Sequence, residues 1–313
     1  MELGNIGTRL GEAAALMHTA FATNKETVMD YTPEFLASCY QYPGLDRELS
    51  PAFFEGERMV SVLASFPRRV RMQGRELRIA LLTFNSVDPG FRRYGLGIEM
   101  VNEAARLAKR KGYDGAIFYC VDGNMANQTS VAGIKASGAV CRRVFALDYV
   151  MAKTGSLEVS ANAVVADEAT FLDLSGRLAE RLPFARLWTR DEVAWELNRY
   201  GVVAHALESG GARGLISGYI LKSIRGTPCA QIENVLWDDL DAEQKSALLR
   251  LFLKSVAGKA QVAVMPLWNY VDADVFLQNG FRNFGRRCMN VYLALWNGAA
   301  MPGPLDAMYI DVL

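Results

Sequence analysis

A run of glycines and arginines at residues 87–97, VDPGFRRYGLG, lies between an apolar segment and an amphipathic one. Glycine allows a tight turn and lets a ligand approach the backbone closely. A helix that begins here offers unpaired N–H groups and a partial positive charge to an anion. Arg92 and Arg93 add cationic donors beside it. The segment therefore predicts a binding site for a pyrophosphate group.

Two common phosphate-binding motifs do not fit this segment. No Gly-Lys-Ser or Gly-Lys-Thr follows, as a Walker A loop requires, and residues 95–97 lack the third glycine of a dinucleotide-binding turn. We expect no metal site either. The chain has only two histidines, and no Cys-x-x-Cys pair occurs among its five cysteines.

The residues around the loop predict the elements that position it. Residues 76–87, ELRIALLTFNSV, have a continuous apolar middle that is typical of a buried strand. Residues 95–112 predict an amphipathic helix, and residues 116–121 predict another buried strand. Alternating strands and helices indicate an α/β fold. Thr83 and Asn85 are polar within the first strand, which favours a cleft on that face.

Length and composition limit the class of protein. The 313 residues are 51% hydrophobic, which is enough for a real core, and the length suggests two domains. The chain has no apolar run long enough for a transmembrane helix, and its first residues lack the basic start of a secretion signal. Together with the scattered cysteines, this predicts a cytoplasmic protein. A formal net charge of +0 argues against a nucleic-acid partner.

The order of expected helices and strands repeats once along the chain. We place the domains at residues 1–153 and 161–313, with residues 154–160, TGSLEVS, as the linker. The second half has no glycine–arginine loop, since WDDL at residues 237–240 stands at the corresponding place. Residues 297–313 form a tail whose structure the sequence leaves open.

The loop and its surroundings resemble motif A of the GNAT N-acetyltransferases. The pattern V-x-P-x-x-R-x-x-G-x-G is carried by Val87, Pro89, Arg92, Gly95 and Gly97. Further along, Asn127 and Gly138 have the spacing of the N-x(10)-G-F motif of this family. The second half resembles the same fold but lacks the loop that binds the cofactor in this family.

The resemblance implies a fold and a cofactor. The fold is α/β, or α+β in some schemes, with two GNAT-like domains, each a mixed, mainly antiparallel twisted sheet flanked by helices. The cofactor is acetyl-CoA or another acyl-CoA, used without a metal. The pantetheine would follow the strand, and the pyrophosphate would lie on the loop and helix. The implied contacts are Phe84, Asn85, Ser86, Val87, Arg92, Arg93, Tyr94, Gly95, Leu96, Gly97, Ile98 and Asn127.

The resemblance leaves the catalytic groups less defined. An oxyanion donor near Asn85 fits the family. The usual general acid is a tyrosine seven residues after the motif asparagine, but Ile134 stands there, so Tyr119 on the preceding strand is an alternative. Some tandem relatives use the carboxylate of the last residue as the base, which would be Leu313 here.

A second group of cations lies before the loop. Arg68, Arg69 and Arg71 are followed by Arg75 and Arg78. One interpretation is a solvated sheet edge that discourages strand pairing. The other is a group that recognises an acidic substrate or the 3′-phosphate of the cofactor.

Together, these features predict an N-acyltransferase that moves an acetyl or other acyl group from coenzyme A to a primary amine of a small molecule or peptide. A longer-chain N-acyltransferase and a non-catalytic acyl-CoA-binding module remain as alternatives. We expect no membrane partner, and the sequence leaves open whether the chain forms a homo-oligomer.

Overall fold

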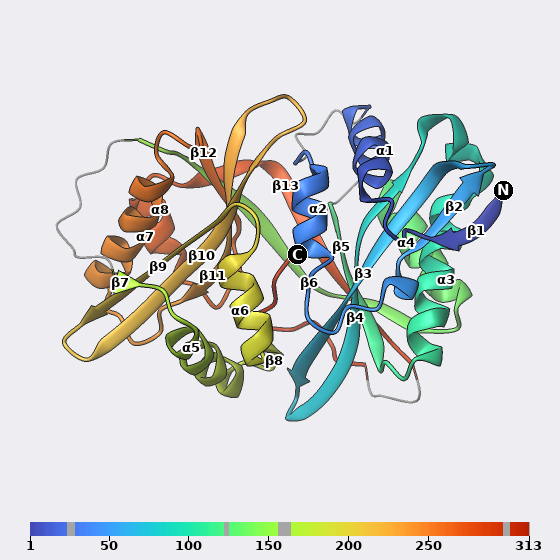
Figure 1. Ribbon diagram of the computed structural model, residues 1–313. Helices are drawn as coiled ribbons and strands as arrows, with labels where there is room; N and C mark the ends of the chain where they lie inside the picture. Colours follow the sequence, from blue (N-terminus) through green and yellow to red (C-terminus); the bar gives the residue numbers. More distant parts are fainter. Residues whose placement is uncertain (24–28, 122–124, 156–163, 297–300, 313) are drawn as a thin grey trace.

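The computed structural model of the chain describes residues 1–23, 29–121, 125–155, 164–296 and 301–312 (Figure 1). Its first half contains β1 (Glu2–Asn5), α1 (Leu10–Ala22), α2 (Pro33–Cys39), β2 (Pro51–Glu55), β3 (Arg58–Met72), β4 (Arg75–Val87), α3 (Leu96–Arg110), β5 (Gly115–Val121), α4 (Met125–Ala136) and β6 (Val140–Lys153). The short 3₁₀ helices η1 (Arg47–Leu49) and η2 (Pro89–Tyr94) precede β2 and α3. The second half contains β7 (Val164–Val165), α5 (Glu168–Arg181), β8 (Phe184–Leu187), α6 (Arg190–Asn198), β9 (Val202–Ser209), β10 (Ala212–Lys222), β11 (Pro228–Leu236), α7 (Ala242–Val256), β12 (Val262–Pro266), α8 (Ala273–Gln278) and β13 (Arg282–Leu295).

The described strands belong to one mixed sheet of 13 strands. Their order is β1-β2-β3-β4-β5-β13-β6-β12-β11-β10-β9-β7, and β8 pairs with β3. The pairs β4–β5 and β11–β12 are parallel, whereas the other pairs are antiparallel. The expected mixed and mainly antiparallel arrangement is confirmed, and a single sheet runs through both halves of the molecule.

The two halves repeat one order of elements and exchange their last strands. The series α1-α2-β2-β3-β4-α3-β5-α4-β6 corresponds to α5-α6-β9-β10-β11-α7-β12-α8-β13. However, β13 lies between β5 and β6, and β6 pairs with β12. Each half is therefore completed by the last strand of the other. The division at residues 154–160 remains a proposal, because most of these residues lie outside the described ones.

Strand β4 is buried on both faces, which explains its continuous apolar run. Successive side chains of a strand point to opposite faces. Ile79 and Leu81 belong to the core cluster that α1 and α2 cover, and Ala80 and Leu82 belong to the cluster under α3. Burial on both faces is the arrangement that favours apolar residues at every position of a strand.

Local sequence sets where the helices begin. At α2, the Thr32 hydroxyl accepts a hydrogen bond from the Phe35 N–H, and Pro33 occupies the first turn. At α7, Asp241 and Gln244 form a reciprocal capping box. Among the helices described, none is long and apolar enough to cross a membrane.

Candidate functional site

Strands β4 and β5 run side by side and then separate. They pair in parallel from Ile79 opposite Gly115 to Leu82 opposite Phe118. Beyond Phe118 no further pair between them occurs in the described part of the chain. Along residues 83–87, the edge of β4 that faces β5 therefore has no paired strand among the described residues.

A bulge lies in β4 where the two strands separate. The register with β3 shifts so that Phe84 and Asn85 together oppose the single residue Leu63. Phe84 has a φ of 57°, in the left-handed region, which costs a non-glycine residue about 1–2 kcal/mol. Bulges bend a strand and redirect its groups. The bulge therefore turns the backbone beyond Phe84 away from β5.

The glycine-rich loop leads from this bulge into α3. Gly95 has a φ of 74° and directly precedes the helix, where no side chain caps the first turn. A Cβ on Gly97 would come within 2.9 Å of the Thr129 Cγ2 atom on α4, so the close approach of the two helices requires glycine there. The Ile98 and Glu99 N–H groups donate to the Gly95 carbonyl, and no N-cap side chain accepts from the first turn; the binding of an anion there stays a prediction.

The two arginines of the loop have different surroundings. Arg92 donates hydrogen bonds of 2.7 Å to the Ala20 carbonyl and to the Thr23 hydroxyl at the end of α1. It thereby ties the loop to the carboxyl end of a helix, where a cation is favoured. Arg93 and Tyr94 are exposed beside the helix start. Arg92 is exposed as well, so both cations of the loop face solvent, and Arg92 also binds the end of α1.

Asn85 connects the bulge to the loop. Its side-chain N–H donates to the Gly97 carbonyl over 3.4 Å. Its side-chain oxygen is buried and has no hydrogen-bond partner among the described residues. A buried acceptor without a partner is unfavourable by about 1–3 kcal/mol, so this oxygen fits a ligand that brings a donor. The Asn127 side chain and Leu313 lie outside the described residues.

The carboxyl-terminal segment is buried in the middle of the molecule (Figure 1). The Tyr119 hydroxyl donates to the Asp311 carbonyl oxygen over 2.8 Å. The Asp311 carboxylate accepts from Arg68 at distances of 2.6–3.1 Å and also pairs with Arg186.

The expectation that the arginine run lies at a solvated edge or recognises an anionic ligand is therefore wrong for Arg68, whose partner is a buried carboxylate of the chain itself. Arg69 is exposed, but β3 pairs with both β4 and β8 at this residue, so the expectation of a solvated sheet edge is wrong here as well.

Charge and burial set the protonation of these groups. Burial by itself raises the pKa of Asp311, but the Arg186 and Arg68 guanidiniums outweigh it and hold the pKa below its ordinary value. Burial, reinforced by the Asp311 charge, raises the pKa of Tyr119 well above its ordinary value. Tyr119 is therefore neutral, and its hydroxyl proton is donated to the backbone of the tail. Its role as a general acid stays a prediction.

Sequence reasoning missed three charged residues of the interior, namely Arg186, Glu233 and Asp311. Glu233 is 2% exposed, and its carboxylate accepts a hydrogen bond from the Val312 N–H. A lone carboxylate in the apolar segment of β11 is a signal that could have identified it. Arg186 and Asp311 give no such local signal, because their pairing joins positions that are far apart in the chain.

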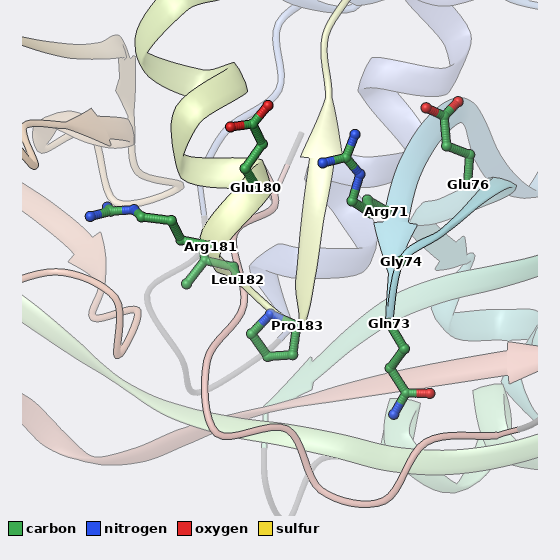
Figure 2. A pocket seen from close by; sticks show the side chains of 8 residues that line it. All are labelled: Arg71, Gln73, Gly74, Glu76, Glu180, Arg181, Leu182 and Pro183. Carbon is green, nitrogen blue, oxygen red and sulfur yellow. The ribbon is translucent and has the colours of Figure 1, made fainter.

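A surface pocket of about 510 Å³ lies elsewhere (Figure 2). It is lined by the β3–β4 hairpin, with Arg71 and Glu76, and by the end of α5, with Glu180 and Arg181, together with the connection to β8. These residues are at the opposite end of β4 from residues 83–87, roughly 25–35 Å away along the strand. The pocket is therefore separate from the loop. In the described ranges, no cluster of three or more His, Cys, Asp or Glu side chains is placed to hold a metal.

Comparisons with known proteins agree with this geometry. Residues 8–128 match the model of the acetyltransferase (GNAT) domain family, a range that includes β4, the loop and α3. No curated protein sequence matches the chain.

Solved structures share the whole fold. A structure of Saccharomyces cerevisiae N-myristoyltransferase with bound myristoyl-CoA and inhibitors has a TM-score of 0.73 at 14% identity, covering 96% of this chain and 81% of that chain. A GCN5-related N-acetyltransferase from Anabaena variabilis has a TM-score of 0.58 at 12% identity, covering 93% and 72%. At such identities the likeness concerns the fold. Residues 8–128 therefore carry the match to the acetyltransferase (GNAT) domain family, and the chain as a whole shares the fold of the N-myristoyltransferase and of the GCN5-related N-acetyltransferase.

Proposed function

We propose that the protein transfers an acetyl group from acetyl-CoA to a primary amine of a small molecule or peptide. The observation that carries the proposal is the separation of β4 from β5 beside the uncapped start of α3. An opened strand edge and a free helix start suit the two ends of one extended ligand, a pantetheine arm and a pyrophosphate. The family match over residues 8–128 supports the same assignment.

The residues present fit this cofactor. The first turn of α3, with Gly95 and Gly97, would hold the pyrophosphate through backbone N–H groups, and Arg93 would add a cation. The backbone of residues 83–87 would bind the pantetheine, and the buried Asn85 side-chain oxygen would accept from an amide of that arm. Acetyl-CoA would supply an activated thioester at this position.

The bulge has a further role in this proposal. Backbone N–H groups that point into the cleft stabilise negative charge as it develops on a carbonyl oxygen. The left-handed Phe84 sets the direction of the backbone groups next to it. Residues 84–87 would therefore supply the oxyanion donor, with Asn85 holding this segment against the Gly97 carbonyl.

Aromatic packing beside the bulge favours a short acyl group. The ring centroids of Phe84 and Tyr31 are 4.5 Å apart, those of Tyr31 and Phe35 are 5.8 Å apart, and those of Phe35 and Tyr219 are 5.3 Å apart. These large side chains fill the interior next to the strand opening. A longer-chain activity is the second candidate, because the fold is similar to an N-myristoyltransferase that binds myristoyl-CoA.

Two measurements test the proposal and its alternatives. Isothermal titration of the folded protein with acetyl-CoA and with myristoyl-CoA should show tighter binding of acetyl-CoA. The opposite preference would favour the long-chain activity, and no heat with either ligand would refute the site. Release of free thiol over a panel of amines should then separate an enzyme from a binding module, which would bind acetyl-CoA but release no thiol.

A glycine substitution tests the loop directly. Gly95→Glu should abolish acetyl-CoA binding, because a side chain at this position blocks close approach and adds a negative charge beside the pyrophosphate. Gly112→Glu is the matched control. Gly95 and Gly112 have φ values of 74° and 77° with open space around them, but Gly112 lies beyond the other end of α3. Equal affinity in the two variants would reject the assignment of the loop.

A further inference from the structure

Glu233 occupies a bulge in the second half that repeats the bulge of β4. The register between β10 and β11 shifts so that Ser217 pairs with Asn234 but Gly218 pairs with Ile232, which leaves Glu233 as the extra residue. The parallel pairing of β11 with β12 ends at Gln231, two residues before Glu233. Glu233 therefore lies where β11 leaves β12, as Phe84 lies where β4 leaves β5.

One peptide unit joins the two strand openings. The Asp311 carbonyl accepts from the Tyr119 hydroxyl, and the N–H of the next residue, Val312, donates to the Glu233 carboxylate. The carbonyl and the N–H of a trans peptide point in opposite directions, so Tyr119 and Glu233 flank this peptide at a separation of at most about 8 Å. Tyr119 directly follows Phe118, the last residue of β5 that pairs with β4. Glu233 is therefore close to the opening of the first half.

The surroundings of Glu233 suit a cation. Burial and then nearby negative charges, Glu233 among them, raise the pKa of five tyrosines, of which Tyr219 is buried and the others are half-buried; these others are Tyr31, Tyr119, Tyr149 and Tyr270. The Glu233 charge also raises the pKa of Cys39 and of Arg199, whose guanidinium is paired with Glu196 at 3.1 Å. Neutral phenol rings around a carboxylate attract an ammonium group by both charge and cation–π interaction.

We propose that Glu233 binds the ammonium group of the acceptor and takes its proton, so that the second half supplies a catalytic residue to the site in the first half. The inference rests on the proposed function. It also names the acceptor class, an alkylamine that is protonated at neutral pH.

The reaction then balances as follows. An N–H bond of the ammonium group breaks, and the proton goes to the Glu233 carboxylate. The freed lone pair forms the C–N bond at the thioester carbonyl carbon, and the C–S bond breaks. The nitrogen loses its second proton to the departing sulfur, which leaves as the thiol, and Glu233 returns its proton to solvent. The products are an amide, coenzyme A and one released proton.

Glu233→Gln tests this role, because glutamine has the same shape and its oxygen can still accept from Val312. For an alkylamine acceptor, kcat/KM should fall by about 10²–10³-fold, the usual contribution of a general base. For hydroxylamine, which is unprotonated at neutral pH, the fall should be less than about tenfold. The dissociation constant for acetyl-CoA should stay within about twofold of the wild-type value. Glu233→Asp, which keeps the carboxylate, should recover part of the alkylamine activity.

A structural carboxylate in the same interior provides the control. Glu196 is fully buried and accepts from Asn234 at 3.0 Å while paired with Arg199. Glu196→Gln should lower the melting temperature and reduce the rates with alkylamine and hydroxylamine by the same factor. Equal losses for both acceptors in Glu233→Gln would overturn the proton-transfer role, and so would full alkylamine activity. A wild-type protein that releases no thiol with any amine would instead overturn the proposed function itself.

Discussion

At the scale of single residues, Asp311 is a negative charge held in the interior by two cations. Its side chain and that of Arg68 are both 0% exposed, and Arg186 completes the group. An isolated buried charge is very unfavourable, so each of the three needs the others. The arginines belong to β3 and β8, and the aspartate belongs to the tail. Their pairing therefore anchors the tail to both β3 and β8, which also pair with each other.

Removing this charge should destabilise the protein strongly. Asp311→Asn leaves two guanidiniums without their carboxylate, and we expect a loss of about 3–5 kcal/mol in the free energy of unfolding at pH 7. Urea denaturation measures it. Asp173→Asn, which breaks half-exposed pairs with Arg177 and Arg213, should lose at most about 1 kcal/mol. Similar losses in the two variants would show that the buried group is not the anchor.

The same group predicts a dependence on pH. The pKa of Asp311 is lowered in the folded state from its ordinary value of 3.8. Its stabilisation is therefore complete above the unfolded-state pKa and is lost as the pH falls below about 4 toward the folded-state pKa. The stability difference between the wild type and Asp311→Asn should shrink over this range. A difference that stays constant down to pH 3 would contradict the ion-pair assignment.

At the scale of elements, the exchange of last strands requires β13 to fit closely against β5. A Cβ on Gly115 of β5 would lie 2.3 Å from the Ala294 carbonyl oxygen of β13. This contact is with backbone, which cannot rotate away as a side chain can. Glycine at position 115 therefore allows the strand of the second half to enter the sheet of the first.

Gly115→Ala should destabilise the protein by about 1–3 kcal/mol, because the added methyl group overpacks the β5–β13 contact. Thermal denaturation measures this loss. Gly176→Ala is the control, because Gly176 lies within α5 with nothing near its Cβ position, and alanine there should stabilise the helix by about 0.5–1 kcal/mol. An unchanged melting temperature for Gly115→Ala would contradict the close strand contact.

At the scale of the whole molecule, the shared sheet should make the two halves unfold together. Trp296 follows β13, yet it lies in the core cluster under α3, where its indole N–H donates to the Tyr113 carbonyl. Loss of either half therefore removes a strand and core side chains from the other. We expect circular dichroism and tryptophan fluorescence to report one coincident unfolding transition. Two separated transitions would show that the halves are independent.

Local sequence was sufficient for the elements that build the proposed cofactor site. The apolar run of residues 76–87 and the amphipathic run of residues 95–112 predict β4 and α3 within two residues of their bounds. The glycine–arginine loop between them is also local, since turns and helix starts depend on neighbouring residues. The sequence thereby determined the GNAT resemblance, the first-half fold and the candidate pyrophosphate loop.

Tertiary structure alone decided how the halves combine. No periodicity predicts that β13 enters between β5 and β6, because strand order depends on long-range pairing. The same holds for the tail, whose Asp311 meets Arg68 across most of the chain, and for Arg92, which binds the end of α1. The sequence around a charged residue does not show which residue will pair with it, because that depends on the fold that removes both from water. Glu233 and Tyr119 therefore come together through the buried tail, which their own segments do not reveal.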